Sequence, residues 1–158
     1  MLNFIKRQRA GFYLNIVLIV LTIISIILFA MNASLGLFVS VSSVNGGIYA
    51  CLIISLVCFL ASIGLGIAPL HGKLIKVVLV DVLRIASTIL LALATVLLVG
   101  ARIENIGYYV GSDLYLGNAQ AIAAVTQAIA CIVLFAITWV FSLIAVFFVQ
   151  EKDAVEAK

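Results

Sequence analysis

Four long apolar runs occupy most of this chain. They cover about Gly11 to Ala33, Ile48 to Ala68, Ile75 to Gly100 and Ala121 to Val149. A helix that rises ~1.5 Å per residue needs ~20 apolar residues to cross ~30 Å of hydrocarbon, and each run is long enough. The residues between the runs are too few for a separate soluble domain. The sequence therefore predicts an all-α membrane protein, a single domain over residues 1–158 with four transmembrane helices.

Composition agrees with this class, because 66% of the residues are hydrophobic and 9% are charged. Soluble domains carry roughly 25% charged residues. The first run could instead be a cleaved signal, but it exceeds the ~7–15 apolar residues of a signal peptide and lacks a convincing small-residue cleavage site. We interpret it as a true first helix.

Basic residues flank the runs unevenly. They lie before the first helix, in the turn between the second and third, and in the short charged tail 150–158: Lys6, Arg7, Arg9, Lys73, Lys76, Lys152 and Lys158. The connections 34–47 and 101–118 contain only one basic residue, Arg102. The positive-inside rule then predicts an antiparallel bundle with both termini in the cytoplasm. We expect the plasma membrane rather than an internal one, and no nucleic-acid partner.

The third run carries two opposite charges, Asp81 and Arg84. If this helix leaves the membrane near Arg102, about 20 residues bring the inner boundary close to both groups. Arg84 is then expected to extend its guanidinium to the inner interface, with Asp81 as its i, i+3 partner. A proton or substrate pathway is the alternative, because ionisable groups inside a bilayer are costly and usually functional.

Polar and small side chains form a seam on each predicted helix. At 100° per residue, one stripe of the third helix gathers Asp81, Arg84, Thr88, Thr95 and Arg102. The matching sets are Asn15, Thr22, Ser25 and Asn32 in the first helix, Cys51, Ser55, Cys58, Ser62 and Gly66 in the second, and Gln120, Ala124, Gln127, Cys131, Thr138 and Ser142 in the fourth. Such seams favour close helix packing and hydrogen bonding between helices. They predict a compact bundle, with a polar pore as the alternative.

Residues suited to catalysis or metal binding are scarce. Cys51, Cys58 and Cys131 lie in apolar runs without a C-x-x-C pair, and we interpret them as small buried hydrophobes. His71 has no neighbouring cluster of metal ligands in the sequence. We therefore expect no catalytic residues, no metal, no cofactor and no enzymatic activity.

The two predicted outer connections differ in character. Residues 34–47 alternate Val with Ser and predict a short extended segment that ends at Gly46 and Gly47. The Asn32 sequon abuts the membrane and is expected to be unused.

The connection 101–118 contains tyrosines, glycines and two acids. Its tyrosines are expected either as anchors at the membrane interface or as a surface for a partner. The candidate partner surface is Tyr108, Tyr109, Asp113 and Tyr115.

Three short segments carry a family resemblance. They are "VDVL" at 80–83, "TVLLVGAR" at 95–102 and "NAQAIAAVTQAIA" at 118–130. With the four-helix topology, they make the chain resemble the MARVEL group of membrane proteins, particularly its small fungal members. The resemblance implies membrane apposition, vesicle transport or organisation of lipid microdomains, and it brings no catalytic residues.

The predicted function is therefore a non-enzymatic scaffold or accessory subunit, which organises a membrane microdomain or supports a larger membrane complex. Its expected partners are membrane lipids and either another integral membrane protein or further copies of itself. Broad faces of the first and fourth helices are expected to face lipid or a partner, with Phe135, Trp139, Phe147 and Phe148 as examples. The alternative is a small transporter or channel component that uses a polar stripe of Asp81, Arg84, Gln120 and Gln127.

Overall fold

The computed structural model describes residues 10–34, 42–67, 73–115 and 117–148. Its elements are α2 (Ala10–Ser34), α3 (Ser42–Ile67), α4 (Lys73–Gly111), the short 3-10 helix η2 (Asp113–Tyr115) and α5 (Ala119–Val146). Within these ranges, four helices are long and apolar enough to cross a membrane. This confirms the prediction of a helical, multi-pass integral membrane protein.

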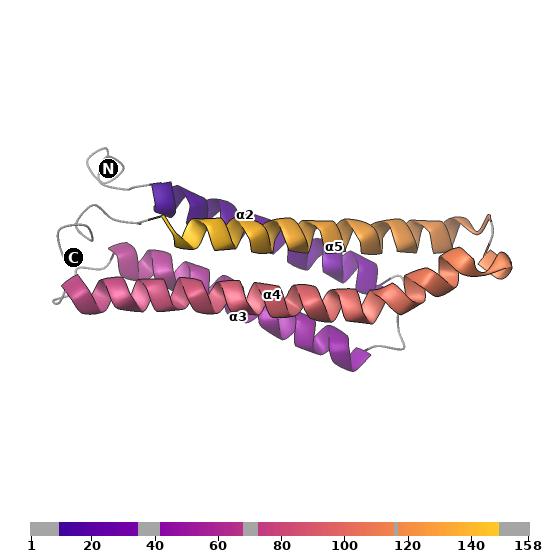
Figure 1. Cartoon of the computed structure of the whole chain (residues 1–158), viewed down its shortest axis with the longest axis horizontal. Coiled ribbons are helices and arrows are strands. Elements are labelled where there is room, and N and C mark those ends of the chain that lie inside the picture. The colour runs from indigo at the N-terminus through magenta and orange to yellow at the C-terminus, as the bar shows by residue number, and fades with distance from the viewer. Residues whose placement is uncertain (1–9, 35–41, 68–72, 116, 149–158) are drawn as a thin grey trace.

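The chain passes back and forth along the long axis of the molecule (Figure 1). Neighbouring helices close a ring, since α3 packs along α4, α4 on α5, α5 on α2, and α2 on α3. The contact between α3 and α4 is the most extensive and that between α2 and α3 the least. We call the end where α2 begins and α5 ends proximal, and the end where α2 ends and α3 begins distal.

Two helices are longer than the sequence predicted, and the first is α3. It begins at Ser42 rather than near Ile48, so residues 42–47 are helical and not extended. Val44 packs against the apolar core, and a Cβ at Gly47 would lie 3.7 Å from Leu97 of α4. These tertiary contacts outweigh the ~1 kcal/mol by which each glycine disfavours a helix relative to alanine. Residues 35–41 of the same predicted connection lie outside the described ranges.

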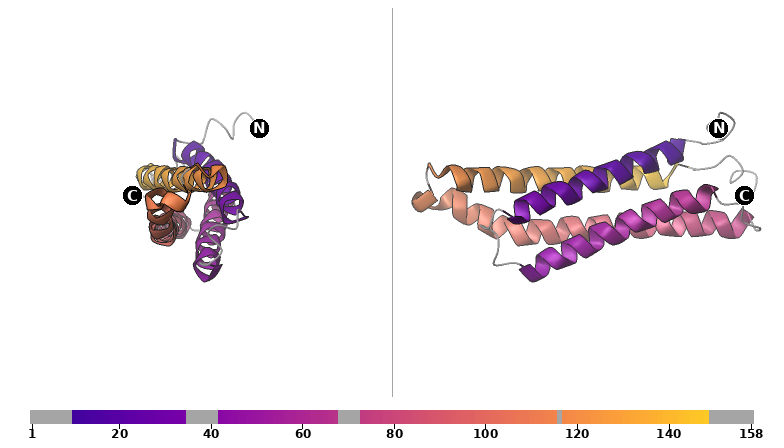
Figure 2. Two further views of the ribbon diagram at one scale, coloured as in Figure 1. Left: turned by 90° about the vertical axis from the view of Figure 1, so that its right-hand side faces the viewer. Right: turned by 180° about the vertical axis from the view of Figure 1, so that it is seen from behind.

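The second longer helix is α4, which ends at Gly111 rather than near Gly100. Most of the predicted connection 101–118 is therefore helix. Ile106 and Tyr109 pack there against the small residues Ala124 and Ala128 of α5. As a result, α4 and α5 project together beyond the distal ends of α2 and α3 (Figures 1 and 2). We call this projecting part, residues 103–115 and 117–122, the hairpin tip.

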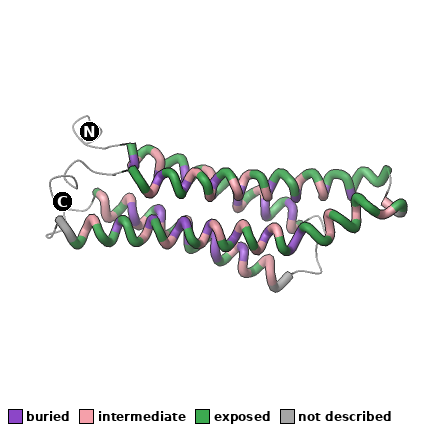
Figure 3. The backbone as a smooth tube through the Cα atoms, in the orientation of Figure 1, coloured by how far each residue is buried: buried purple, intermediate pink, exposed green. Residues whose placement is uncertain are grey.

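The core follows a regular spacing of buried residues, drawn in purple in Figure 3. On α2 the buried positions recur at intervals of four and three: Gly11, Asn15, Leu18, Thr22, Ser25, Phe29 and Asn32. The main apolar cluster joins all four helices through Leu18, Phe29, Leu52, Phe59, Leu91, Leu98 and Phe135, among others. Since lipid tails are as apolar as these side chains, close packing rather than the hydrophobic effect holds the helices together.

Two of the aromatic residues expected on the outer faces lie inward. Phe135 is buried, with its ring centroid 6.2 Å from that of Phe29, and Trp139 packs against the same cluster while only half-buried. Phe135 shares the buried stripe of α5 because it stands four residues after Cys131 and three before Thr138. Phe147 and Phe148 are exposed as expected.

Replacing Phe135 with Ala should destabilise the bundle. The change removes the ring that contacts Phe29 and leaves a cavity, which costs roughly 3–5 kcal/mol in protein cores. Equilibrium unfolding in mixed micelles, titrated with a denaturing detergent, would measure the loss. Val133→Ala removes an exposed side chain from the same helix and should change stability little. Equal stability of both variants would contradict this packing.

Candidate functional site

Two buried arginines mark two polar layers in the apolar bundle. Arg84 and Arg102 both belong to α4, and their side chains are 2% and 0% exposed. The helical rise places them about 27 Å apart along the axis. This separation is close to the ~30 Å thickness of a hydrocarbon core.

Arg102 connects the distal ends of the helices. Its Nε donates to Asn32 Oδ1 of α2 at 3.1 Å, and its Nη2 donates to Asn45 Oδ1 of α3 at 3.2 Å. Asn32 Nδ2 in turn donates to the Ala124 carbonyl of α5 at 3.3 Å. The guanidinium carbon also lies 5.9 Å from the ring centroid of Phe29. We call Arg102, Asn32, Asn45 and the Ala124 carbonyl the distal polar cluster; it links all four helices.

Asn45 was missed by the sequence analysis because residues 34–47 were predicted to be extended. The sequence did contain a signal for this residue. An Asn near the start of a membrane helix often hydrogen-bonds to a neighbouring helix through its side-chain amide. Asn32, by contrast, was placed in the seam, where the structure also puts it. Because its amide is buried and hydrogen-bonded, the Asn32 sequon is inaccessible in the folded protein.

Arg84 organises the proximal end differently from the prediction. Its Nη1 donates to the Phe148 carbonyl at 2.9 Å and its Nη2 to the Ala145 carbonyl. The last carbonyls of a helix lack partners within the helix and carry partial negative charge, so a cation is favourable there. The guanidinium therefore turns inward to the end of α5, whereas Asp81 is exposed. Arg84 thus hydrogen-bonds to these carbonyls rather than to Asp81, and the expected position of its guanidinium at the inner membrane interface stays a prediction.

Several other seam residues make hydrogen bonds within the bundle. Ser55 Oγ donates to the Ser87 carbonyl of α4 at 3.2 Å, and Ser62 Oγ accepts from Asn15 Nδ2 of α2 at 2.7 Å. The hydroxyls of Thr88 and Thr95 donate to carbonyls of their own helix.

The polar path of the transport alternative is not assembled in one place. Asp81 is exposed at the proximal end, and Gln120 is exposed in the first turn of α5 at the distal end. Gln127 is half-buried, and Arg84 is bonded to the α5 carbonyls. Gln120 and Gln127 each stand one residue before the buried stripe of α5, which passes through Ala121 and Ala128.

The hairpin tip brings three tyrosines together. The ring centroids of Tyr109 and Tyr115 lie 4.8 Å apart, and Tyr108 lies 5.8 Å from each of them. All three pairs are edge-to-face, the geometry that aromatic rings prefer. Tyr108 is 58% exposed, while the other two are half-buried. We call these residues the tyrosine cluster.

A hydrogen-bonded turn holds Tyr115 against α4. The backbone N–H of Tyr115 donates to the Ser112 carbonyl at 3.1 Å, and that of Asn118 donates to the Tyr115 carbonyl at 3.0 Å. Gly117 has a φ of +80°, which only glycine adopts without strain. Asn118 then caps α5, because its side chain accepts from the backbone N–H groups of Gln120 and Ala121.

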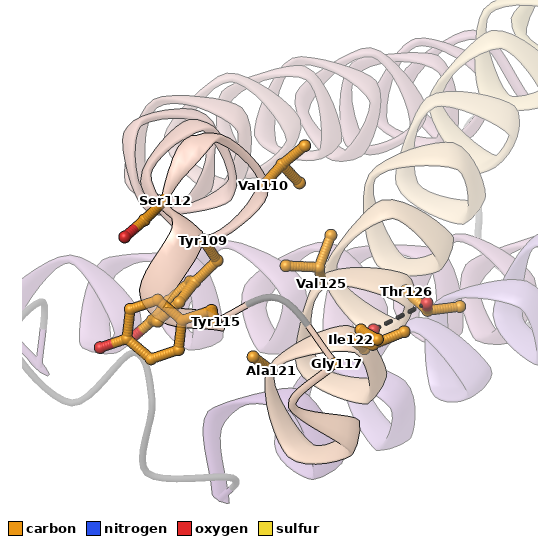
Figure 4. A pocket seen from close by; sticks show the side chains of 9 residues that line it. All are labelled: Tyr109, Val110, Ser112, Tyr115, Gly117, Ala121, Ile122, Val125 and Thr126. Atoms are coloured by element: carbon orange, nitrogen blue, oxygen red, sulfur yellow. Dashed lines mark hydrogen bonds between the residues drawn. The ribbon is translucent and has the colours of Figure 1, made fainter.

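A pocket of about 260 Å³ lies beside the tyrosine cluster (Figure 4). One wall comes from the end of α4 and from η2, and the other from the first turns of α5. The lining residues are Tyr109, Val110, Ser112, Tyr115, Gly117, Ala121, Ile122, Val125 and Thr126. Thr126 directs its hydroxyl to the Ile122 carbonyl, so the α5 wall is apolar. The α4 wall offers phenol rings and the Ser112 hydroxyl.

Charge around the tip is negative. Glu104 and Asp113 are both exposed. The sequence from residue 103 to residue 150 contains no Lys, Arg or His. The tip therefore presents two carboxylates, an aromatic cluster and an apolar pocket on one projecting hairpin.

Groups for metal binding do not converge in the described residues. No set of three or more His, Cys, Asp or Glu side chains comes together there. Cys51 and Cys131 are buried and Cys58 is half-buried, all three within helices. The expected absence of catalysis and of a cofactor stays a prediction.

Replacing Arg102 with Leu should destabilise the bundle more than any nearby charge change. The substitution leaves the buried oxygens of Asn32 and Asn45 without their donor, at an expected cost of about 2–4 kcal/mol. Arg102→Lys should recover only part of the lost stability, because a single ammonium cannot replace the several N–H donors of the planar guanidinium. Unfolding titrations in mixed micelles would give the values. Glu104→Gln is the control, and an Arg102→Leu protein as stable as the native one would refute the role of the cluster.

A comparison with protein families, curated proteins and solved structures finds no match to this chain. The resemblance to the MARVEL group therefore stays a prediction from three short segments. What the protein does must be inferred from its own residues, above all from the hairpin tip.

Proposed function

We propose that this chain is a non-enzymatic membrane scaffold or accessory subunit, which binds a partner membrane protein through its hairpin tip. The observation that carries this proposal is the projection of α4 and α5 beyond α2 and α3 (Figure 1). The projecting part holds the tyrosine cluster. A bundle that only had to fold would not need the added turns of α4. The tip supplies a surface that the bundle itself does not use.

The chemistry of the tip suits recognition. Tyrosines dominate binding energy at many interfaces, because they bury a large area at a small cost in side-chain entropy. Edge-to-face contacts already restrict the three rings, so binding would order them little further. Interface anchoring alone would explain single tyrosines in contact with lipid, but it does not require three rings packed on one another.

The spacing of the two buried arginines supports a position for the tip relative to the membrane. We place the distal polar cluster at the outer boundary of the hydrocarbon and Arg84 near the inner one, since their spacing matches its thickness. Val110 then lies about 12 Å beyond the outer boundary. Lys73 and Lys76 stand at the proximal start of α4, so the positive-inside rule puts this end, where α2 begins and α5 ends, in the cytoplasm and the tip outside the plasma membrane.

Thiol labelling tests this orientation. In a chain whose native cysteines are replaced, Ser112→Cys should react with an impermeant reagent in intact cells, because Ser112 lies in the tip. Lys158→Cys should react only after the cells are permeabilised. The opposite pattern would invert the topology and remove the tip from the outer side.

Substituting the tyrosine cluster tests the proposed function. Tyr108, Tyr109 and Tyr115 changed together to Ser should weaken association with the copurifying partner by roughly 30-fold or more, as for loss of an aromatic hot spot. Quantitative copurification from native membranes measures the change, and circular dichroism confirms that the helices remain. Tyr13→Ser is a matched control, since Tyr13 is 47% exposed on α2 at the proximal end. The proposal is refuted if the triple variant associates as strongly as the native chain with the same partner, whether that partner is another protein or a second copy of the chain.

A further inference from the structure

The pocket beside the tyrosine cluster is lined by uncharged and mostly apolar residues. None of its lining residues is charged, and its α5 wall is aliphatic through Ala121, Ile122 and Val125. Its volume of about 260 Å³ lies just below the ~300–1,000 Å³ typical of small-molecule sites. A space of this size and polarity suits one large apolar side chain better than a whole cofactor.

The charges beside the pocket restrict what can approach it. Asp113 begins η2, whose last residue Tyr115 lines the pocket, and Glu104 lies on α4 before Tyr109. Both carboxylates are exposed, and the nearest basic residue before them in the sequence is the buried Arg102. Helical periodicity turns Glu104 to the side of α4 away from Tyr109, so Asp113, which stands between the pocket residues Ser112 and Tyr115, is the carboxylate that makes the approach to the pocket anionic. It attracts basic groups and repels acidic ones.

From these two features we propose that the pocket receives one apolar side chain from a partner protein, on a segment where Lys or Arg flank that residue. The apolar side chain packs between the Tyr109 and Tyr115 rings and the α5 wall, while a flanking cation faces Asp113. This proposal rests on the proposed function and specifies the partner's chemistry at the same tip.

A lipid is the less suitable occupant for two reasons. Tyr109 lies about 10 Å beyond Arg102 along α4, above the level at which we place the end of the hydrocarbon. Anionic headgroups would also meet the two carboxylates. An apolar group that reaches the pocket at this height is therefore supplied by a protein segment.

Binding of short synthetic peptides to the full chain tests the proposal. The protein is reconstituted in nanodiscs of phosphatidylcholine, and the probe is a fluorescent pentapeptide with a central phenylalanine between pairs of lysines. Anisotropy should report binding to the protein-loaded discs in excess of that to empty discs. Replacing the central phenylalanine with serine, or the lysines with glutamates, should weaken binding about tenfold, because each change removes one of the two recognised features.

Variants of the pocket and of the carboxylates, with one control on α5, complete the experiment. Val125→Trp fills the pocket and should weaken binding of the lysine–phenylalanine peptide about tenfold. Asp113→Asn should weaken it a few-fold and reduce its salt dependence, whereas Glu104→Gln, on the side of α4 away from the pocket, should have a smaller effect. Val133→Trp adds the same ring to an exposed site of α5 outside the pocket and should leave binding unchanged.

Several results would overturn the proposal. Equal binding by Val125→Trp and by the native chain would show that the pocket is not used. Equal binding to empty discs would assign the peptide to lipid, and tight binding of the acidic peptide would contradict the charge argument. If the native partner is lost on changing the tyrosine cluster but kept by Val125→Trp, this inference fails while the proposed function stands. If the partner is kept by both, the proposed function fails as well.

Discussion

Burial of the Arg102 guanidinium is the constraint on which the distal half of the molecule depends. A charged group in an apolar bundle is tolerated only where hydrogen-bond acceptors surround it. Asn32 and Asn45 supply two of them, and the Phe29 ring lies against the cation. To deliver these groups, α2 must reach Asn32 and α3 must already be helical at Asn45. The ends of both helices are thus fixed by one side chain of α4.

The level of Arg102 also marks where the four-helix bundle ends and the hairpin tip begins. Above Arg102, α2 and α3 have ended, and α4 and α5 continue with each other as their main support through Ile106, Tyr109, Ala124 and Ala128. The small alanines bring the two helices close, and the Gly117 turn brings Tyr115 back onto Tyr109. Under the proposed function, a partner protein binds this hairpin at a part that the described residues of α2 and α3 do not reach.

The sequence predicted the helices and much of the core, but not where the helices end. The intervals of four and three among Asn15, Thr22, Ser25 and Asn32 identify the buried stripe of α2 because helical geometry alone sets them. The apolar run suggested that α4 ends near Gly100, yet packing on α5 carries the helix to Gly111 and outweighs the local cost of Gly100 and Gly107. The partners of Arg84 are backbone carbonyls of α5, which no residue type reveals. The tyrosines were recognised, but their mutual contact depends on the turn at Gly117.

The depth of α4 residues in a lipid bilayer tests whether the hairpin tip stands outside the hydrocarbon, beyond Arg102. Val96, Ile103 and Val110 are similarly exposed, at 68%, 63% and 72%, so a spin label at each site differs mainly in its height relative to Arg102. Collision with oxygen reports the hydrocarbon, and collision with a water-soluble nickel complex reports water. The account predicts that oxygen dominates at Val96, that the two are comparable at Ile103, and that nickel dominates at Val110. Labels at Val96 and Val110 that are equally inaccessible to nickel would place the tip within the membrane and contradict it.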